Sequence, residues 1–321
     1  MHEQILRDLL QKEVIGPEEA EKIRHFETIR PFSLHWELKT MLYLGVLLLN
    51  VGLGVLVYEN IDTIGHTVLI LLTGCVSAIC LGYAYKRRAP FSAGQADSPT
   101  PYYDYILLLG CLTFLIMEGY WQYQYRVFGD RYGLATFLPT VLFFGIAYIL
   151  DNRGVLSLAV TLLASWVGVT VTPTELLRNN DFNSEAIIGT GIALGIFLAI
   201  IPFFSERMNF KKHFSLTYLN FSVHLLMISC LSGVIALDNW PLYFPLLCLA
   251  VGFYIWYART RSSFYFLVVA VIYGYIGVTY LLLNAAEGLD FALYLLYFLL
   301  SCGAVIVFLV NYKKFFNIRS E

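Results

Sequence analysis

Ten long runs of apolar residues restrict the folds that are open to this chain. Each run is about long enough to cross a hydrocarbon core of roughly 30 Å at about 1.5 Å per residue. Backbone N–H and C=O groups find no water partner in lipid, so each run must be helical. A β-barrel is not expected, because apolar and polar residues do not alternate in these runs as they do in barrel strands. The sequence therefore predicts an all-α fold, a polytopic transmembrane helical bundle. The ten predicted spans are Met41–Tyr58, Ile64–Tyr85, Tyr105–Tyr120, Leu134–Leu150, Val155–Val171, Ala186–Phe204, Phe214–Leu237, Leu242–Ala258, Phe264–Leu283 and Phe291–Val310.

The composition agrees with a membrane environment. Hydrophobic residues make up 58% of the chain and charged residues only 14%. An ordinary soluble domain has about 25% charged residues, so a water-soluble fold is excluded.

The basic residues predict how the spans are oriented. All of the 21 Lys and Arg residues except Arg126, Arg131 and Arg178 fall in segments on one side of the ten spans. Cytoplasmic connections carry the excess of Lys and Arg in membrane proteins. We therefore expect both termini in the cytoplasm and the protein in the inner membrane of a cell. Adding or removing one span would place basic connections on both sides of the membrane, so the distribution of Lys and Arg supports the number of spans as well.

Three segments follow from this topology. Residues 1–37 are predicted to form a cytoplasmic amphipathic helical hairpin, because Ile5, Leu6, Leu9 and Leu10 recur at helical spacing before the Gly16-Pro17 break. This hairpin is too short to bury its own core, so it packs as a cap or docks a protein partner. Residues 41–311 form the ten-span domain. Residues 312–321 form a basic cytoplasmic tail.

No motif in the sequence supports a catalytic or cofactor assignment. The six cysteines all fall inside apolar runs, and none forms a Cys-x-x-Cys pair or a Cys/His cluster. A zinc or iron–sulfur site needs convergent ligands, so we expect no metal and no cofactor. The chain has no Gly-x-x-x-x-Gly-Lys, His-Glu-x-x-His or Gly-x-Ser-x-Gly motif, and no basic-aromatic surface for nucleic acid. The sequence therefore offers no motif on which an enzyme assignment could be based.

Acidic residues gather near the predicted outer ends of the spans. One interpretation is that selection for basic residues inside left ordinary solvated acids outside. The other is an acidic outward-facing cleft, lined by Glu59, Glu118 and Glu287, that draws a ligand. The candidate ligand-binding residues at these ends and in the seventh span are Glu59, Asn60, His66, Glu118, Trp121, His224, Asn284, Glu287 and Asp290.

A few polar residues lie at membrane depth, where they are costly. Asn50 lies among glycines of the first span and is expected to bond across a close helix contact. Asn220 and His224 lie one turn apart on one face of the seventh span. Asn220 is expected to be structural. His224 is either an interior histidine with protein partners or part of a proton relay or substrate contact.

The N-terminal quarter resembles a known family. The stretch Leu9–Ile23, with its leucines followed by Gly16 and a Glu-Ala…Ile segment, is similar to the head of the DUF2157 family of predicted bacterial membrane proteins. The Gly-rich run Leu44–Gly52 and the Glu59-Asn60 turn resemble that family's first helix. The usual Trp after this Asn is Ile61 here. The resemblance implies a bacterial multi-pass membrane protein and adds no chemistry.

Three functions fit these observations. The first is transport or binding of a small molecule or membrane lipid through the acidic outer cleft. The second is a non-catalytic membrane subunit or scaffold that docks a partner through residues 1–37. The third is a membrane-embedded enzyme acting on a lipid-linked substrate, which would need paired carboxylates in one cleft.

Overall fold

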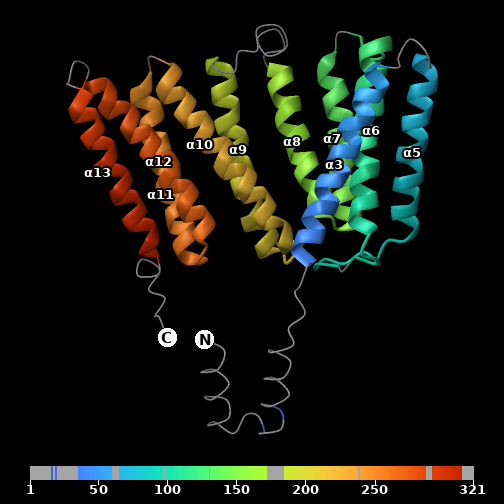
Figure 1. Ribbon diagram of the computed structural model, residues 1–321, viewed down its shortest axis with the longest axis horizontal. Coiled ribbons are helices and arrows are strands. Elements are labelled where there is room, and N and C mark those ends of the chain that lie inside the picture. The colour runs from blue at the N-terminus through green and yellow to red at the C-terminus, as the bar shows by residue number, and fades with distance from the viewer. Residues whose placement is uncertain are drawn as a thin grey trace. The chain divides into compact units, whose positions relative to one another are not determined.

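The computed structural model describes residues 16, 19, 35–59, 65–96, 98–129, 131–171, 184–237, 239–286 and 291–312. These residues form helices and connections and include no strand. Most of the predicted N-terminal hairpin and all but Tyr312 of the basic tail lie outside them. Figure 1 shows the helices of the described residues.

Among the described residues, ten helices have the length and apolar composition to cross a membrane, and they coincide with the ten predicted runs. The all-α polytopic fold is therefore confirmed. The helices are α3 (His35–Glu59), α5 (His66–Lys86), α6 (Tyr103–Tyr125), α7 (Tyr132–Leu150), α8 (Arg153–Val171), α9 (Glu185–Arg207), α10 (Ser215–Ala236), α11 (Trp240–Thr260), α12 (Phe264–Ala285) and α13 (Phe291–Val310), with a short 3-10 helix η2 (Lys212–Phe214) before α10.

Helix α6 is longer than predicted, because it continues past Tyr120 to Tyr125. Gln122 explains the extension. Its side-chain amide donates to the carbonyl of Gly129 at 3.1 Å and accepts the N–H of Phe128 at 2.9 Å. The Gln122 side chain thus gives hydrogen-bond partners to backbone groups of the turn that follows α6. A search for apolar runs does not detect such a cap, because Gln122 is polar.

The chain divides into two units, residues 1–58 and 59–321. In the first unit, α3 contains Asn50, whose amide donates to the carbonyl of Val46 one turn earlier at 2.7 Å. This bond within the helix satisfies one N–H of the Asn50 amide, while its buried Oδ1 has no hydrogen-bond partner among the described residues.

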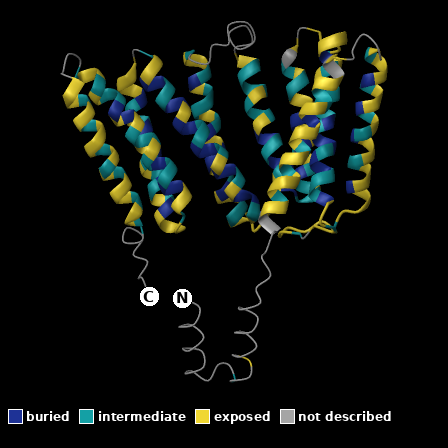
Figure 2. Cartoon of the chain, viewed as in Figure 1, coloured by how far each residue is buried: buried dark blue, intermediate teal, exposed yellow. Residues whose placement is uncertain are grey.

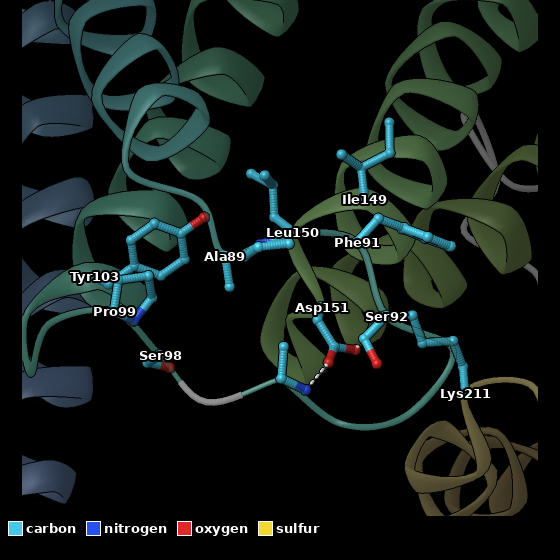
Figure 3. Close-up of a pocket in the computed structure, with 12 residues that line it drawn as sticks. Ala89, Phe91, Ser92, Ser98, Pro99, Tyr103, Ile149, Leu150, Asp151 and Lys211 are labelled. Atoms are coloured by element: carbon cyan, nitrogen blue, oxygen red, sulfur yellow. Dashed lines mark hydrogen bonds and ion pairs between the residues drawn. The ribbon is translucent and has the colours of Figure 1, made fainter.

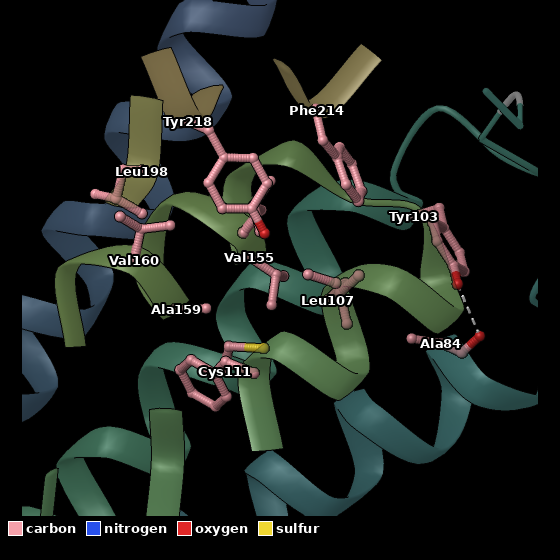
Figure 4. Packing of buried hydrophobic residues seen from close by; sticks show 13 residues of the cluster. Ala84, Tyr103, Leu107, Cys111, Val155, Ala159, Val160, Leu198, Phe214 and Tyr218 are labelled. Carbon is pink, nitrogen blue, oxygen red and sulfur yellow. Dashed lines mark hydrogen bonds between the residues drawn. The ribbon is translucent and has the colours of Figure 1, made fainter. Parts of the chain in front are cut away.

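The second unit is built from antiparallel helix pairs, α5 with α6, α7 with α8, α9 with α10 and α11 with α12. Helix α10 also packs on α8, α11 and α12. It supplies Tyr218 to one hydrophobic cluster, which also contains Phe214 of η2, and Leu219 and Val223 to another. The first cluster, shown in Figure 4, also contains residues of α5 to α9. Helix α10 is thus the shared element of the two clusters.

Helix α13 packs differently from α10, because none of its residues is buried (Figure 2). Its contacts with α12 include hydrogen bonds. The hydroxyls of Thr279 and Tyr297 lie 2.9 Å apart, and those of Tyr275 and Ser301 lie 3.0 Å apart. An apolar helix surface in a membrane gains about as much from contact with lipid tails as from contact with protein. Hydrogen bonds between polar side chains therefore commonly hold membrane helices together.

Helix α9 lies close to the backbone of α10 at Gly195. A Cβ at this position would lie 2.9 Å from the Cβ of Leu226 and 3.0 Å from its backbone N and Cα. The hydroxyl of Ser222 donates to the carbonyl of Gly195 at 2.5 Å across the same contact. A residue with no side chain is therefore required here, as at other tight crossings of membrane helices.

We predict that Gly195→Ala destabilises the protein in detergent by about 1–3 kcal/mol, because backbone atoms of α10 cannot move away from the added methyl group. Thermal unfolding by circular dichroism measures the effect. The control is Gly252→Ala on α11, where an added Cβ meets nothing within 4 Å. Equal unfolding temperatures for the two variants would contradict the account of this crossing.

Candidate functional site

The second unit has two chemically distinct ends. The basic end carries the connections 87–102, 151–152, 208–214 and 261–263, with basic residues that include Arg87, Arg88, Arg153, Lys211 and Arg261. The opposite end is the one at which α10 ends and α11 begins.

A cavity of about 730 Å³ lies at the opposite end, where α10, α11 and α12 meet. This volume falls within the roughly 300–1,000 Å³ typical of pockets that bind small molecules. Most of its lining is apolar, with polar atoms from Trp240, Tyr280 and Asn284. The lining residues are Val234, Ile235, Ala236, Leu237, Trp240, Phe244, Val278, Tyr280, Leu281, Leu282, Asn284 and Ala285.

Tyr280 and Asn284 lie one turn apart on α12 in the wall of this cavity. The Tyr280 hydroxyl donates to the carbonyl of Ile235 on α10 at 3.1 Å and so joins the two helices beside the cavity. The side chain of Asn284 is exposed and can both donate and accept. The cavity can therefore hold an apolar group and offer hydrogen bonds at one place.

The cavity contains one of the residues that the sequence singled out, Asn284. Glu287 and Asp290, which follow it, lie outside the described residues, as does Asn60. Trp240 and Tyr280 were not predicted. In the sequence they resemble the aromatic anchors found at many membrane interfaces, so only the structure reveals that they line a cavity.

On α5 and α6, the structure pairs His66 with a tyrosine. The Nδ1 atom of His66 lies 2.6 Å from the hydroxyl of Tyr120. Glu118 is 6% exposed, and its Oε1 has no hydrogen-bond partner among the described residues. Trp121 is 42% exposed. The convergence of Glu59, Glu118 and Glu287 on one cleft stays a prediction, because Glu287 is not described.

His224 has two tyrosine partners on α12. Its Nδ1 lies 3.1 Å from the Tyr273 hydroxyl and its Nε2 lies 2.8 Å from the Tyr265 hydroxyl. Tyr265 in turn donates to Oδ1 of Asn220. The hydroxyl proton of Tyr265 is thus committed to Asn220, so Nε2 of a neutral His224 carries the hydrogen and Nδ1 accepts from Tyr273. The four side chains form one directed hydrogen-bond chain between α10 and α12.

A second polar cluster lies at the basic end and was not predicted from the sequence. Oδ1 of Asp151 is 2.9 Å from Nζ of Lys211 and 2.6 Å from Nε2 of His213. Oδ2 of Asp151 accepts the backbone N–H of Ala96 at 2.5 Å (Figure 3). The Asp151 and Lys211 side chains are only 5% and 1% exposed. The cluster therefore joins three connections, α5–α6, α7–α8 and α9–α10, through one buried carboxylate.

The backbone places these charges. Asp151 ends α7 with φ 56°, and Lys211 precedes η2 with φ 49°, so both lie in the left-handed region. The backbone N–H of Lys211 donates to the carbonyl of Ala93 at 2.7 Å. Asn152 caps α8, since its Oδ1 accepts the N–H of Val155 at 2.9 Å. These turns direct the side chains of residues 151 and 211 toward each other.

The electrostatics of this cluster favour the ionised carboxylate. Burial alone raises the pKa of Asp151, but the Ala96 N–H, the Lys211 ammonium and the nearby His213 outweigh burial and hold this pKa below its ordinary value. The adjoining cavity measures only about 10 Å³, roughly the space of one water molecule. The arrangement is therefore suited to locking connections together and too small for a larger ligand.

The sequence could have offered a weak signal for this cluster. Asp151 is an acid at the predicted basic side, and Lys211 and His213 lie in another connection of that side. Which connections touch is decided by helix packing, so the pairing itself was not visible. Among the described residues, no group of three His, Cys, Asp or Glu side chains could hold a metal ion.

The ten apolar helices define a multi-pass membrane protein. Residues 7–156 match the model of the DUF2157 family, described as a predicted membrane protein. The resemblance found in the first quarter of the sequence is therefore confirmed, and the match reaches the start of α8. No curated protein and no solved structure matches the chain.

We predict that Asp151→Asn destabilises the protein by about 3 kcal/mol at pH 7, because it leaves the buried Lys211 ammonium without its carboxylate. A carboxyl whose pKa is lowered on folding contributes stability above its ordinary pKa of about 3.9 and loses it as the pH falls through the lower folded value. The gap between wild type and variant should therefore narrow as the pH falls below about 4. Unfolding temperatures measured from pH 7 to pH 3 test this.

The control for this prediction is Glu206→Gln. Glu206 also pairs with a base, Arg261, but these side chains are 33% and 50% exposed. An exposed pair contributes at most about 1 kcal/mol. A Glu206→Gln loss as large as that of Asp151→Asn would show that burial of the charge is not the cause.

Proposed function

We propose that the protein binds a membrane lipid, or a small amphipathic molecule of similar chemistry, in the cavity at the opposite end. The observation that carries the proposal is the cavity itself, about 730 Å³ between the ends of α10, α11 and α12. Its apolar walls suit an acyl chain or an apolar ring. Trp240, Tyr280 and Asn284 offer the polar groups that a headgroup or a polar substituent requires.

The orientation of the chain is part of this proposal. With the basic end in the cytoplasm and the protein in the inner membrane, the cavity opens toward the outer side. The support is the location of all but three of the 21 Lys and Arg residues on one side of the spans. The ligand would then enter from the outer leaflet or from the outer solution.

A diazirine-tagged phospholipid tests the binding. We expect ultraviolet light to attach this probe, in proteoliposomes, chiefly to peptides that contain residues 234–244 and 278–285. Ala285→Trp should lower this labelling about tenfold, which corresponds to about 1.4 kcal/mol of affinity, because the indole ring fills part of the cavity. Peptide mapping by mass spectrometry measures the label.

The matched control is Ala292→Trp, the same substitution at an exposed position of α13. It should leave labelling of the cavity peptides unchanged. Labelling spread evenly over α13 and the cavity peptides, and unaffected by Ala285→Trp, would refute the proposed binding site.

A further inference from the structure

Three tyrosines of α12 point to one face of α10. Tyr265, Tyr273 and Tyr280 are spaced eight and seven residues apart, so they lie on one face of the helix. Tyr265 bonds to Asn220 and His224, Tyr273 bonds to His224, and Tyr280 donates to the carbonyl of Ile235. We call this line of hydrogen bonds between α10 and α12 the tyrosine seam.

The seam extends through most of the membrane. Tyr265 is the second residue of α12 at the basic end, and Tyr280 lies in the wall of the cavity at the opposite end. At about 1.5 Å per residue, the distance along the helix from Tyr265 to Tyr280 is about 22 Å, against a hydrocarbon core of roughly 30 Å. Polar atoms therefore occur near one end, near the middle and near the other end of the span.

Part of the seam lies on the surface of the bundle. Asn220 is exposed, Tyr265 is 42% exposed, and the bonds that Tyr265 makes with Asn220 and His224 are exposed as well. The amide nitrogen of Asn220 donates to no residue that the structure describes. In a membrane helix such a surface faces lipid, where an unsatisfied donor is costly. If these hydrogen bonds served only to hold α10 and α12 together, we would expect other side chains of the protein to cover them.

We propose that phospholipid headgroups cross between the two leaflets along the tyrosine seam, with the cavity as the binding place at one end. The proposal rests on the proposed function, since the same cavity receives the lipid. Hydroxyl, imidazole and amide groups replace the water that a headgroup loses in the hydrocarbon core. The acyl chains remain in the bilayer, because the hydrogen bonds at both ends of the seam are exposed.

Such movement would be passive and would run in both directions. The sequence has no Gly-x-x-x-x-Gly-Lys motif for a nucleotide to drive it. The hydrogen-bond chain can also rearrange while a headgroup passes. A headgroup that donates to Tyr273 or accepts from Asn220 needs only rotation of hydroxyl groups, not movement of a helix.

A dithionite assay with a fluorescent phospholipid in proteoliposomes tests the proposal, because dithionite destroys the fluorescence only of probe in the outer leaflet. Wild-type protein should allow the inner-leaflet probe to be lost as well. The double substitution Tyr265→Phe and Tyr273→Phe should slow this loss about tenfold, or about 1.4 kcal/mol in the barrier. Asn220→Leu, at an exposed position, should slow it too and does not depend on core packing.

The matched control is Tyr275→Phe. Tyr275 is on the same helix, but its hydroxyl bonds to Ser301 of α13 and not to α10. This variant should retain the wild-type rate. Loss of outer-leaflet probe only, or an equal slowing by Tyr275→Phe, would overturn the proposal.

Photolabelling of the same proteoliposomes separates the two proposals. Labelled cavity peptides without lipid movement would refute the seam as a path and leave the binding function intact. Absence of both labelling and movement would refute both.

Discussion

Backbone hydrogen bonding without water is the constraint on which this structure depends. A peptide group in hydrocarbon must find its partner within the protein, so each apolar run closes on itself as a helix. Side-chain hydroxyls in the spans follow the same rule, as where Thr73 donates to the carbonyl of Leu69 and Thr113 to that of Leu109, both at 2.8 Å. Polar groups that use other helices as partners are therefore the informative ones.

The polar groups that are not paired within their own helix differ in their burial and in their partners. The Asp151 cluster is buried and joins connections of the basic end, so it acts on stability. The chain from Asn220 through His224 to Tyr273 joins two spans and is partly exposed at the surface of the bundle. Glu118 has a buried oxygen with no partner among the described residues. The cavity at the opposite end adds a space of ligand size that is lined in part by polar groups.

Local properties of the sequence were predictable, and pairings between distant segments were not. The ten spans followed from hydropathy, and the shared face of Asn220 and His224 followed from helical periodicity. The tyrosine partners of His224 lie more than 40 residues away, and Lys211 lies 60 residues from Asp151, so only helix packing brings them together. Asn284 was predicted near a ligand site, but the apolar character of its surroundings depends on α10 and α11.

The proposal that the cavity faces outward depends on the proposed topology, and cysteine accessibility tests this topology most directly. Asn239 is exposed between α10 and α11, and Ser262 is exposed between α11 and α12. In intact cells, a membrane-impermeant maleimide should label the Asn239→Cys variant and should label Ser262→Cys only after the membrane is opened. Labelling of Ser262→Cys from outside, or protection of Asn239→Cys, would contradict the account.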